Sequence, residues 1–175
     1  MLLTPLFIWF LFQGKGSIFY AIMLFTCAAL TDRYDGYLAR RYGLVTDLGN
    51  FLDPLADKIL VFGTFFAFYA LKIVPLWFLV VLCARDFSVT LLRAIMIYRG
   101  RPLVTSQLGK IKTVIQFAGI YIAFGYLICL NYRMSSFIIK GVTYLMQASI
   151  YVVAALTIVS ALDYFFQNRR QLFGM

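Results

Sequence analysis

The sequence predicts an all-α integral membrane protein with six transmembrane helices, the first of them short or truncated. Composition, hydropathy and length support this class. The chain of 175 residues is 63% hydrophobic and 13% charged, whereas soluble domains are roughly 45–50% apolar and 25% charged. Its mean hydropathy is +0.87. A crossing takes about 20 apolar residues, so this length allows about six crossings in one domain, residues 1–175, and no large soluble domain.

Each helix is predicted from an apolar run that ends where Gly, Pro or charged residues cluster. The expected helices span 2–13, 17–40, 48–72, 75–98, 106–130 and 138–166. The breaks between them fall at 13–16, 42–47, 72–75, 99–102 and 131–136. The first run reaches only about 20 Å at 1.5 Å per residue. We therefore expect either that it lies partly in the membrane interface or that the sequence lacks the first turns of this helix.

The basic residues predict the orientation in the membrane. When the 16 Lys and Arg are sorted by alternate helix ends, twelve fall on one side and four on the other. The smaller group is Lys15, Lys72, Arg133 and Lys140. Because basic residues concentrate on the cytoplasmic side of a membrane, we expect both termini and the loops 41–47 and 99–105 in the cytoplasm, with the protein in the cell membrane.

The acidic residues gather on that same side. All seven acids are Asp, and five of them lie within residues 32–57. Asp32 and Asp35 are spaced i, i+3 near the end of the second helix. Asp53 and Asp57 are spaced i, i+4 in the first turns of the third, so each pair shares a helical face. Four facing carboxylates would repel one another without a cation, and oxygen ligands suit Mg²⁺ or Mn²⁺. We predict two divalent cations about 3.5–4 Å apart, an arrangement used for displacement at phosphorus.

Each of these acids, taken singly, could have another role. Acids near helix ends are often solvated or paired with basic neighbours, which here are Arg33, Arg40, Arg41 and Lys58. Two carboxylates on each of two helices favour the metal site over four separate surface roles. Asp47 is different, because an N-cap or first-turn position explains it fully.

The residues around the acids follow a longer pattern, Asp32-x2-Asp35-Gly36-x2-Ala39-Arg40-x8-Gly49-x3-Asp53-x3-Asp57. This pattern resembles the signature of the CDP-alcohol phosphotransferase family at every fixed position, and the likeness covers essentially the whole chain. The resemblance implies six helices around a cytoplasm-facing polar cavity, two divalent cations held by the four Asp, and a homodimer. It implies that Asp57 also acts as general base and that Gly36, Arg40 and Gly49 bind the CDP group.

The resemblance also implies a reaction. An alcohol would attack the lipid-side phosphorus of a CDP-linked lipid and release CMP, with Asp57 taking the hydroxyl proton. A covalent intermediate on a Cys–His or Ser–His pair is not expected, because the chain has no His. We expect lipid and small-molecule partners and no nucleic acid.

A second set of charged residues concerns the acceptor alcohol. Arg85 and Arg93 lie two turns apart on the fourth helix, and Lys110 and Lys112 open the fifth. A helix N-terminus with two Lys is a suitable site for an anion, so we predict that these four residues bind a phosphate of the acceptor. Alternatively, the two Lys anchor the helix at the membrane surface, and Arg85 pairs with Asp86 or another acid.

The same region narrows the choice of substrates. The segments Arg85-Asp86-x6-Arg93 and Ser106-x2-Gly109-Lys110-x-Lys112-Thr113-x2-Gln116 are similar to the branch of the family that joins CDP-diacylglycerol to sn-glycerol 3-phosphate. Inositol phosphate, serine and phosphatidylglycerol stay open as acceptors. An ion-coupled transporter is an alternative from another class, since intramembrane acids also mark ion paths. Against it, the clustered acids lie near one membrane face with none placed to continue a path.

Overall fold

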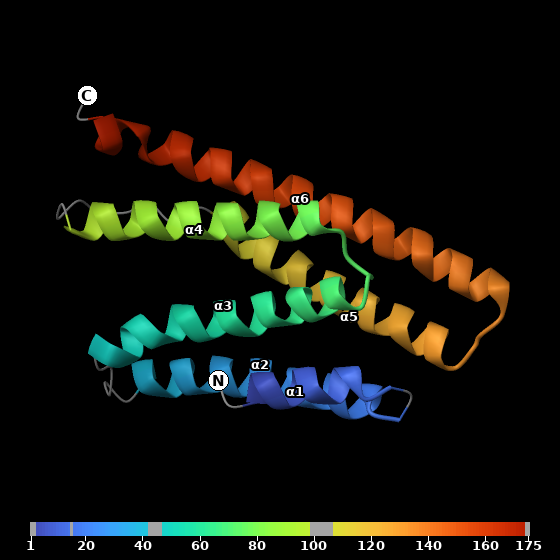
Figure 1. The fold of residues 1–175 in the computed structure, drawn as a ribbon. Helices are drawn as coiled ribbons and strands as arrows, with labels where there is room; N and C mark the ends of the chain where they lie inside the picture. Colours follow the sequence, from blue (N-terminus) through green and yellow to red (C-terminus); the bar gives the residue numbers. More distant parts are fainter. Residues whose placement is uncertain (1–2, 15, 42–46, 99–106, 174–175) are drawn as a thin grey trace.

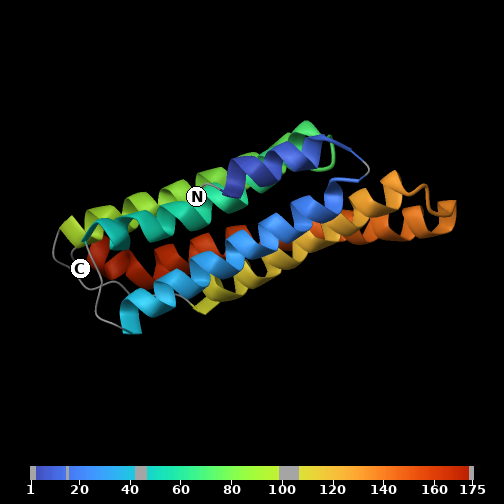
Figure 2. The same ribbon diagram turned by 90° about the horizontal axis from the view of Figure 1, so that it is seen from below.

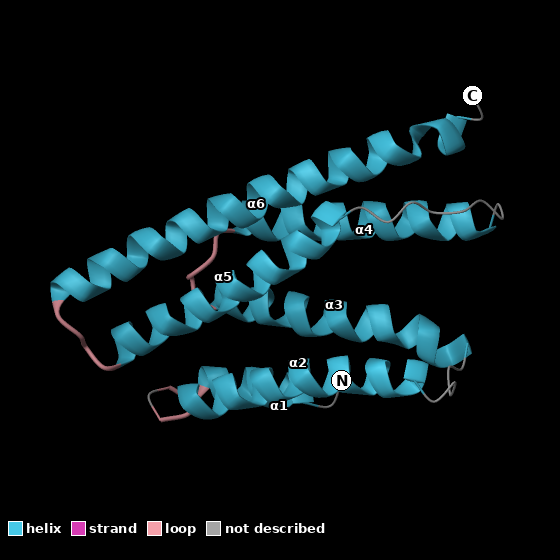
Figure 3. Ribbon diagram, turned by 180° about the vertical axis from the view of Figure 1, so that it is seen from behind, coloured by secondary structure: helices cyan, strands magenta, loops and turns pink. Residues whose placement is uncertain are grey.

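The protein is a bundle of six helices, seen in a computed structural model (Figure 1). The structure describes residues 3–14, 16–41, 47–98 and 107–173, with side chains for 3–14, 16–31, 34, 58–92, 108, 109 and 111–168. No strand occurs among these residues (Figure 3). The helices are α1 Leu3–Phe12, α2 Ile18–Arg41, α3 Asp47–Ala70, α4 Leu76–Tyr98, α5 Gln107–Asn131 and α6 Ser136–Phe173.

The six expected helices are confirmed, and every end but one lies within two residues of its predicted place. The exception is the end of α6, which reaches Phe173 and not 166. Beyond the apolar run, Gln167 Nε2 donates to Asp163 Oδ1 at 2.8 Å and Asn168 Nδ2 donates to the Tyr164 carbonyl at 2.9 Å. The end of an apolar run shows only where hydrophobic residues stop, and here the helix continues through the polar residues that follow.

The long helices run alternately in opposite directions along the bundle (Figures 1 and 2). The turns 71–75 and 132–135 lie at one end, which we name the turn end. The end of α2, the start of α3 and the end of α4 lie at the other, which we name the motif end. The alternation of helix ends expected from the sequence is therefore present.

Two of the turns end helices without glycine. Lys72 and Arg133 follow α3 and α5 in the left-handed conformation, with φ of 59° and 47°. In each turn the next residue donates back into the helix: Ile73 N–H to the Phe68 carbonyl at 2.9 Å and Met134 N–H to the Cys129 carbonyl at 3.1 Å. This geometry satisfies carbonyls that would otherwise lack a partner at the end of a helix.

An aromatic core joins four of the helices. Phe7 of α1, Phe25 of α2, Phe68 of α3 and Phe124 of α5 are all fully or almost fully buried. The Phe124 ring centroid lies 6.2, 5.6 and 5.3 Å from those of Phe7, Phe25 and Phe68. Edge-to-face pairs of this kind add about 0.5–1.5 kcal/mol each beyond the burial of their area. The core therefore fixes α1, α2, α3 and α5 against one another.

The first helix is short, with 10 residues, and begins partway along the bundle (Figure 1). It crosses α3 closely at Gly63. A Cβ there would lie 3.2 Å from Ile8 Cδ1 and 3.3 Å from Thr4 Cγ2. The missing side chain at Gly63 is thus what lets α1 pack against α3.

The outer surface is strongly apolar. Many large apolar side chains are exposed, among them Phe137 at 89%, Phe87 at 72% and Tyr144 at 71%. Water-soluble monomers rarely expose large contiguous apolar patches. Within the described part, two segments are long and apolar enough to cross a bilayer, Ile111–Asn131 and Ser136–Asn168. Shorter apolar helices are Leu3–Phe12, Ile18–Thr31 and Lys58–Ala70. These features fit a membrane protein, and the number of six spans stays a prediction.

Candidate active site

The motif acids lie on two neighbouring helices at the motif end. Asp32 and Asp35 are on the last turns of α2, and Asp53 and Asp57 are on the first turns of α3. The two helices pack against each other (Figure 1). The side chains of several predicted site residues lie outside the described residues, so their roles stay predictions. They are Asp32, Asp35, Asp53, Asp57, Gly36, Arg40, Gly49, Arg93 and Lys110.

The described part of the site is a charged cluster between α4 and α5. Asp86 Oδ1 accepts hydrogen bonds from Arg85 Nη1 at 2.9 Å and from Lys112 Nζ at 2.7 Å. The three side chains are nearly withdrawn from solvent, at 15% exposed for Arg85, 12% for Asp86 and 4% for Lys112. One carboxylate oxygen thus holds two cations from different helices, and we name these three residues the Asp86 cluster.

The cluster is built on one face of α5. Gly109, Lys112 and Gln116 are spaced i, i+3 and i+7, which places them on one side of a helix. Arg85 reaches this face from α4, and its Nη2 lies 3.9 Å from where a Cβ at Gly109 would stand. Along the described residues the backbones of α4 and α5 are not in close contact. Long polar side chains therefore connect the two helices.

A further hydrogen bond connects the cluster to the helix that carries Asp53 and Asp57. Lys58 of α3 donates to Thr90 Oγ1 of α4, and Thr90 Oγ1 donates to the Asp86 backbone carbonyl at 2.5 Å. Lys58 follows Asp57 directly in the chain. The helix of the predicted base is thus tied to the helix of the Asp86 cluster one turn from Asp86.

The cluster carries excess positive charge and unused donors. Arg85 and Lys112 contribute two positive charges and Asp86 one negative, a net of +1. Arg85 Nε and Gln116 Nε2 are buried and have no hydrogen-bond partner in the described part of the chain. Gln116 itself is only 4% exposed. Unpaired donors and net charge away from water are costly unless a ligand satisfies them, so this chemistry suits an oxygen-rich anion.

The structure brings together two of the four predicted acceptor-binding residues, Arg85 and Lys112. It also shows the alternative pairing of Arg85 with Asp86. Lys112 is 3% exposed, which is not the position of a lysine that anchors a helix at the membrane surface. Sequence reasoning did not anticipate that Asp86 holds Lys112, that Lys58 binds Thr90, or that Gln116 is buried. A glutamine one turn after a lysine, within an apolar helix, was the available signal for Gln116.

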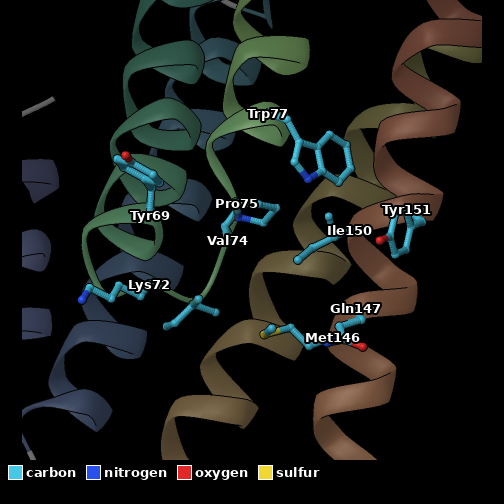
Figure 4. Close-up of a pocket in the computed structure, with 10 residues that line it drawn as sticks. Tyr69, Lys72, Val74, Pro75, Trp77, Met146, Gln147, Ile150 and Tyr151 are labelled. Atoms are coloured by element: carbon cyan, nitrogen blue, oxygen red, sulfur yellow. The ribbon is translucent and has the colours of Figure 1, made fainter.

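A cavity of about 560 Å³ lies elsewhere, between the α3–α4 turn and α6 (Figure 4). Ile73, Val74, Met146 and Ile150 contribute to its lining. Trp77 and Tyr151 flank it with ring centroids 5.8 Å apart and nearly parallel planes. The cavity lies toward the turn end and contains none of the predicted site residues, so it is not the polar cavity that the sequence predicts at the motif end.

Replacing Asp86 by Asn is expected to lower the free energy of unfolding by about 3–5 kcal/mol, because Arg85 and Lys112 would lie side by side without a counter-charge. Thermal unfolding in detergent measures this. Adding Lys112→Met to Asp86→Asn should recover part of the lost free energy of unfolding, since the double variant removes one of the two cations that repel each other.

Asp163→Asn is the matched control for this prediction. Asp163 accepts a hydrogen bond from the exposed Gln167, and an Asn side chain at that position can still accept it through its amide oxygen, so Asp163→Asn should lower the free energy of unfolding less than Asp86→Asn. The charge of Asp86 would have no structural role if both variants unfolded at the wild-type temperature.

A helical bundle with an apolar surface, paired acids on adjoining helix ends and a buried cationic cluster fits a membrane protein with a charged site between its helices. The chain belongs to the CDP-alcohol phosphatidyltransferase family, whose model matches residues 1–160. It is therefore a phosphatidyltransferase, and its role is in phospholipid synthesis. This membership removes the transporter alternative.

Individual relatives point to one branch of the family. The chain is 36% identical over 148 residues to a CDP-diacylglycerol–glycerol-3-phosphate 3-phosphatidyltransferase of Bacillus subtilis, covering 83% of this chain and 72% of the relative. It is 32% identical over 182 residues to a probable phosphatidylglycerophosphate synthase of Mycobacterium tuberculosis, covering 100% of this chain and 80% of the relative. A CMP-forming cardiolipin synthase of Streptomyces coelicolor is 33% identical over 115 residues, 63% of this chain and 54% of the relative.

Proposed function

We propose that this protein transfers a phosphatidyl group from CDP-diacylglycerol to sn-glycerol 3-phosphate, forming phosphatidylglycerophosphate and CMP. The reaction is supported by similarity to two relatives whose names state both substrates, over 83% and 82% of this chain, and to a third whose name states the product, over 100% of this chain. The observation that supports a phosphorylated acceptor is the Asp86 cluster, because serine offers no phosphate to a buried net positive charge, whereas glycerol 3-phosphate does. The names of the relatives favour glycerol 3-phosphate over inositol phosphate.

The metal assignment is consistent with the donors that the chain offers. Residues 32–41 and 47–57 are helical, so the i, i+3 and i, i+4 spacings of the four Asp act as spacings on helices. Asp32, Asp35, Asp53 and Asp57 would hold two Mg²⁺ or Mn²⁺ ions, since carboxylate oxygens suit hard cations. When bound, such ions neutralise the pyrophosphate and the charge that develops on the leaving oxygen.

The protein's own groups then have distinct tasks. Asp57 accepts the proton of the attacking hydroxyl of glycerol 3-phosphate. The hydroxyl oxygen bonds to the phosphorus of the phosphatidyl group, and the bond from that phosphorus to the bridging oxygen breaks, so that CMP leaves. Gly36, Arg40 and Gly49 bind the CDP part of the donor. Arg85, Arg93, Lys110 and Lys112 hold the acceptor phosphate beside α3.

The setting of the reaction is part of the proposal. Six helices cross the cell membrane, and the motif end faces the cytoplasm, where the water-soluble substrate, glycerol 3-phosphate, is available. Lys72, Arg133 and Lys140 lie toward the turn end, which accords with a cytoplasmic motif end under the positive-inside rule. We expect a homodimer.

An assay of the purified protein with CDP-diacylglycerol and a panel of acceptors tests the proposal. We expect CMP release with glycerol 3-phosphate, and little with serine, inositol phosphate or phosphatidylglycerol. Preference for serine, inositol phosphate, phosphatidylglycerol or an uncharged alcohol would overturn the acceptor assignment and leave the phosphatidyltransferase activity in place.

Removing a phosphate contact should impair use of the acceptor selectively. We expect Arg93→Ala and Lys110→Ala each to raise the KM for glycerol 3-phosphate about tenfold or more, because a charge-assisted hydrogen bond contributes about 1.5–3 kcal/mol. The KM for CDP-diacylglycerol and the unfolding temperature should stay near wild type. Unchanged acceptor titrations in both variants, and in variants of Arg85 and Lys112, would contradict the role of these four residues.

A further inference from the structure

Gln116 is a buried side chain that takes no part in the reaction proposed above. It is 4% exposed, and its Nε2 has no hydrogen-bond partner among the described residues. Buried polar groups in proteins are almost always hydrogen-bonded, and polar side chains within an apolar helix usually serve a function. The amide therefore needs a partner that the described protein does not provide.

The position of Gln116 indicates what that partner is. Gln116 lies one helical turn after Lys112 on the face of α5 that meets Arg85 and Asp86. Two other buried polar atoms have no partner in the described part of the chain, Tyr164 Oη on α6 and Arg85 Nε, and Arg85 belongs to the Asp86 cluster. Gln116 Nε2 and Arg85 Nε are both donors, and the three charged residues of the Asp86 cluster sum to +1. A ligand that completes this set must bring acceptor oxygens and negative charge.

We propose that Gln116 contacts the substrate, donating from its amide to an oxygen of the phosphorylated acceptor held at the Asp86 cluster. This inference rests on the proposed function and adds a residue to it. Asp86 acts as a positioning residue in this arrangement: it keeps Arg85 Nη1 and Lys112 Nζ on one carboxylate oxygen, and Arg85 Nε, which has no partner among the described residues, is left for the ligand. Gln116 supplies a neutral donor one helical turn beyond Lys112 on α5.

The experiment compares Gln116→Met with wild type in CMP release, titrating each substrate separately. Met keeps the length of the side chain and removes the amide. We expect the KM for glycerol 3-phosphate to rise about tenfold or more, with the KM for CDP-diacylglycerol unchanged, because a hydrogen bond to a charged oxygen is lost. Gln116→Glu should raise it further, since a carboxylate would repel the acceptor phosphate or occupy Lys112.

Thermal unfolding separates contact with the substrate from a structural role. Without substrate, Gln116→Met should unfold at the wild-type temperature or slightly above it, because an unpaired buried donor is removed. Saturating glycerol 3-phosphate should raise the unfolding temperature of wild type, since a ligand that binds the native state stabilises it, and should raise that of Gln116→Met less. Asn131→Leu is the control: its amide Nδ2 already donates to the Leu127 carbonyl at 3.0 Å, at the turn end. It should leave both KM values unchanged.

The outcomes are distinguishable. If wild type releases CMP with glycerol 3-phosphate and Gln116→Met keeps the wild-type KM for it, the role of Gln116 is wrong and the proposed function stands. A rise only in the KM for CDP-diacylglycerol, or a large fall in unfolding temperature with both KM values altered, also overturns the inference. If wild type shows no CMP release that depends on glycerol 3-phosphate, the proposed function and the inference fall together.

Discussion

Asp53→Asn is expected to abolish CMP release while the protein still folds in detergent. Asn is a near-isostere that lacks the negative charge of a metal ligand. Asp32→Asn, Asp35→Asn and Asp57→Asn should behave alike, Asp57→Asn through loss of the base as well. Steady-state CMP release measures the effect, and unfolding temperature and elution volume show whether each variant is folded.

Asp47→Asn is the matched control for these variants. Asp47 begins α3, a position where a helix start alone accounts for an acidic residue, so its variant should keep close to wild-type turnover. If Asp53→Asn retained more than about a tenth of the wild-type rate, it would have lost less than about 1.4 kcal/mol of transition-state stabilisation. So small a loss is incompatible with a side chain that would hold the catalytic cations.

The second large effect concerns the cations themselves. Treatment with EDTA should remove all turnover, and adding Mg²⁺ or Mn²⁺ should restore it, because a site made of carboxylates without His or Cys favours hard divalent ions. Zn²⁺, which prefers nitrogen and sulfur ligands, should restore less. Full activity in protein shown by elemental analysis to be free of metal would exclude the two-cation mechanism.

The contact between Lys58 and Thr90 bears on how the two halves of the site work together. Asp57 and Lys58 are adjacent on α3, and Lys58 binds α4 one turn from Asp86. The predicted base and the cluster proposed for the acceptor phosphate are therefore joined through neighbouring residues. This accords with a reaction in which the acceptor hydroxyl must lie next to the base while its phosphate is held on α4 and α5.

Much of the fold follows from local pattern. Apolar runs of membrane length, separated by Gly, Pro and charged clusters, predict each of the six helices to within two residues at all ends but one. The end of α6 is the exception because the helix continues into a polar segment beyond residue 166, and an apolar run cannot predict a helix end that lies among polar residues. The helix ends at Lys72 and Arg133 have no glycine in the left-handed position. Their turns are closed by backbone hydrogen bonds, which the residue types at these positions do not predict.

For the candidate site as well, some features follow from the sequence and others only from the tertiary structure. The sequence alone determined which acids share a helix face and which end of the bundle collects the basic residues, because helical spacing and the membrane's charge rule are local properties of the chain. Only the tertiary structure decided that Asp86 takes Lys112 as well as Arg85, that Lys58 binds Thr90, and that Gln116 is buried with no partner among the described residues. Long side chains can reach several neighbours, and the packing of the helices selects among them.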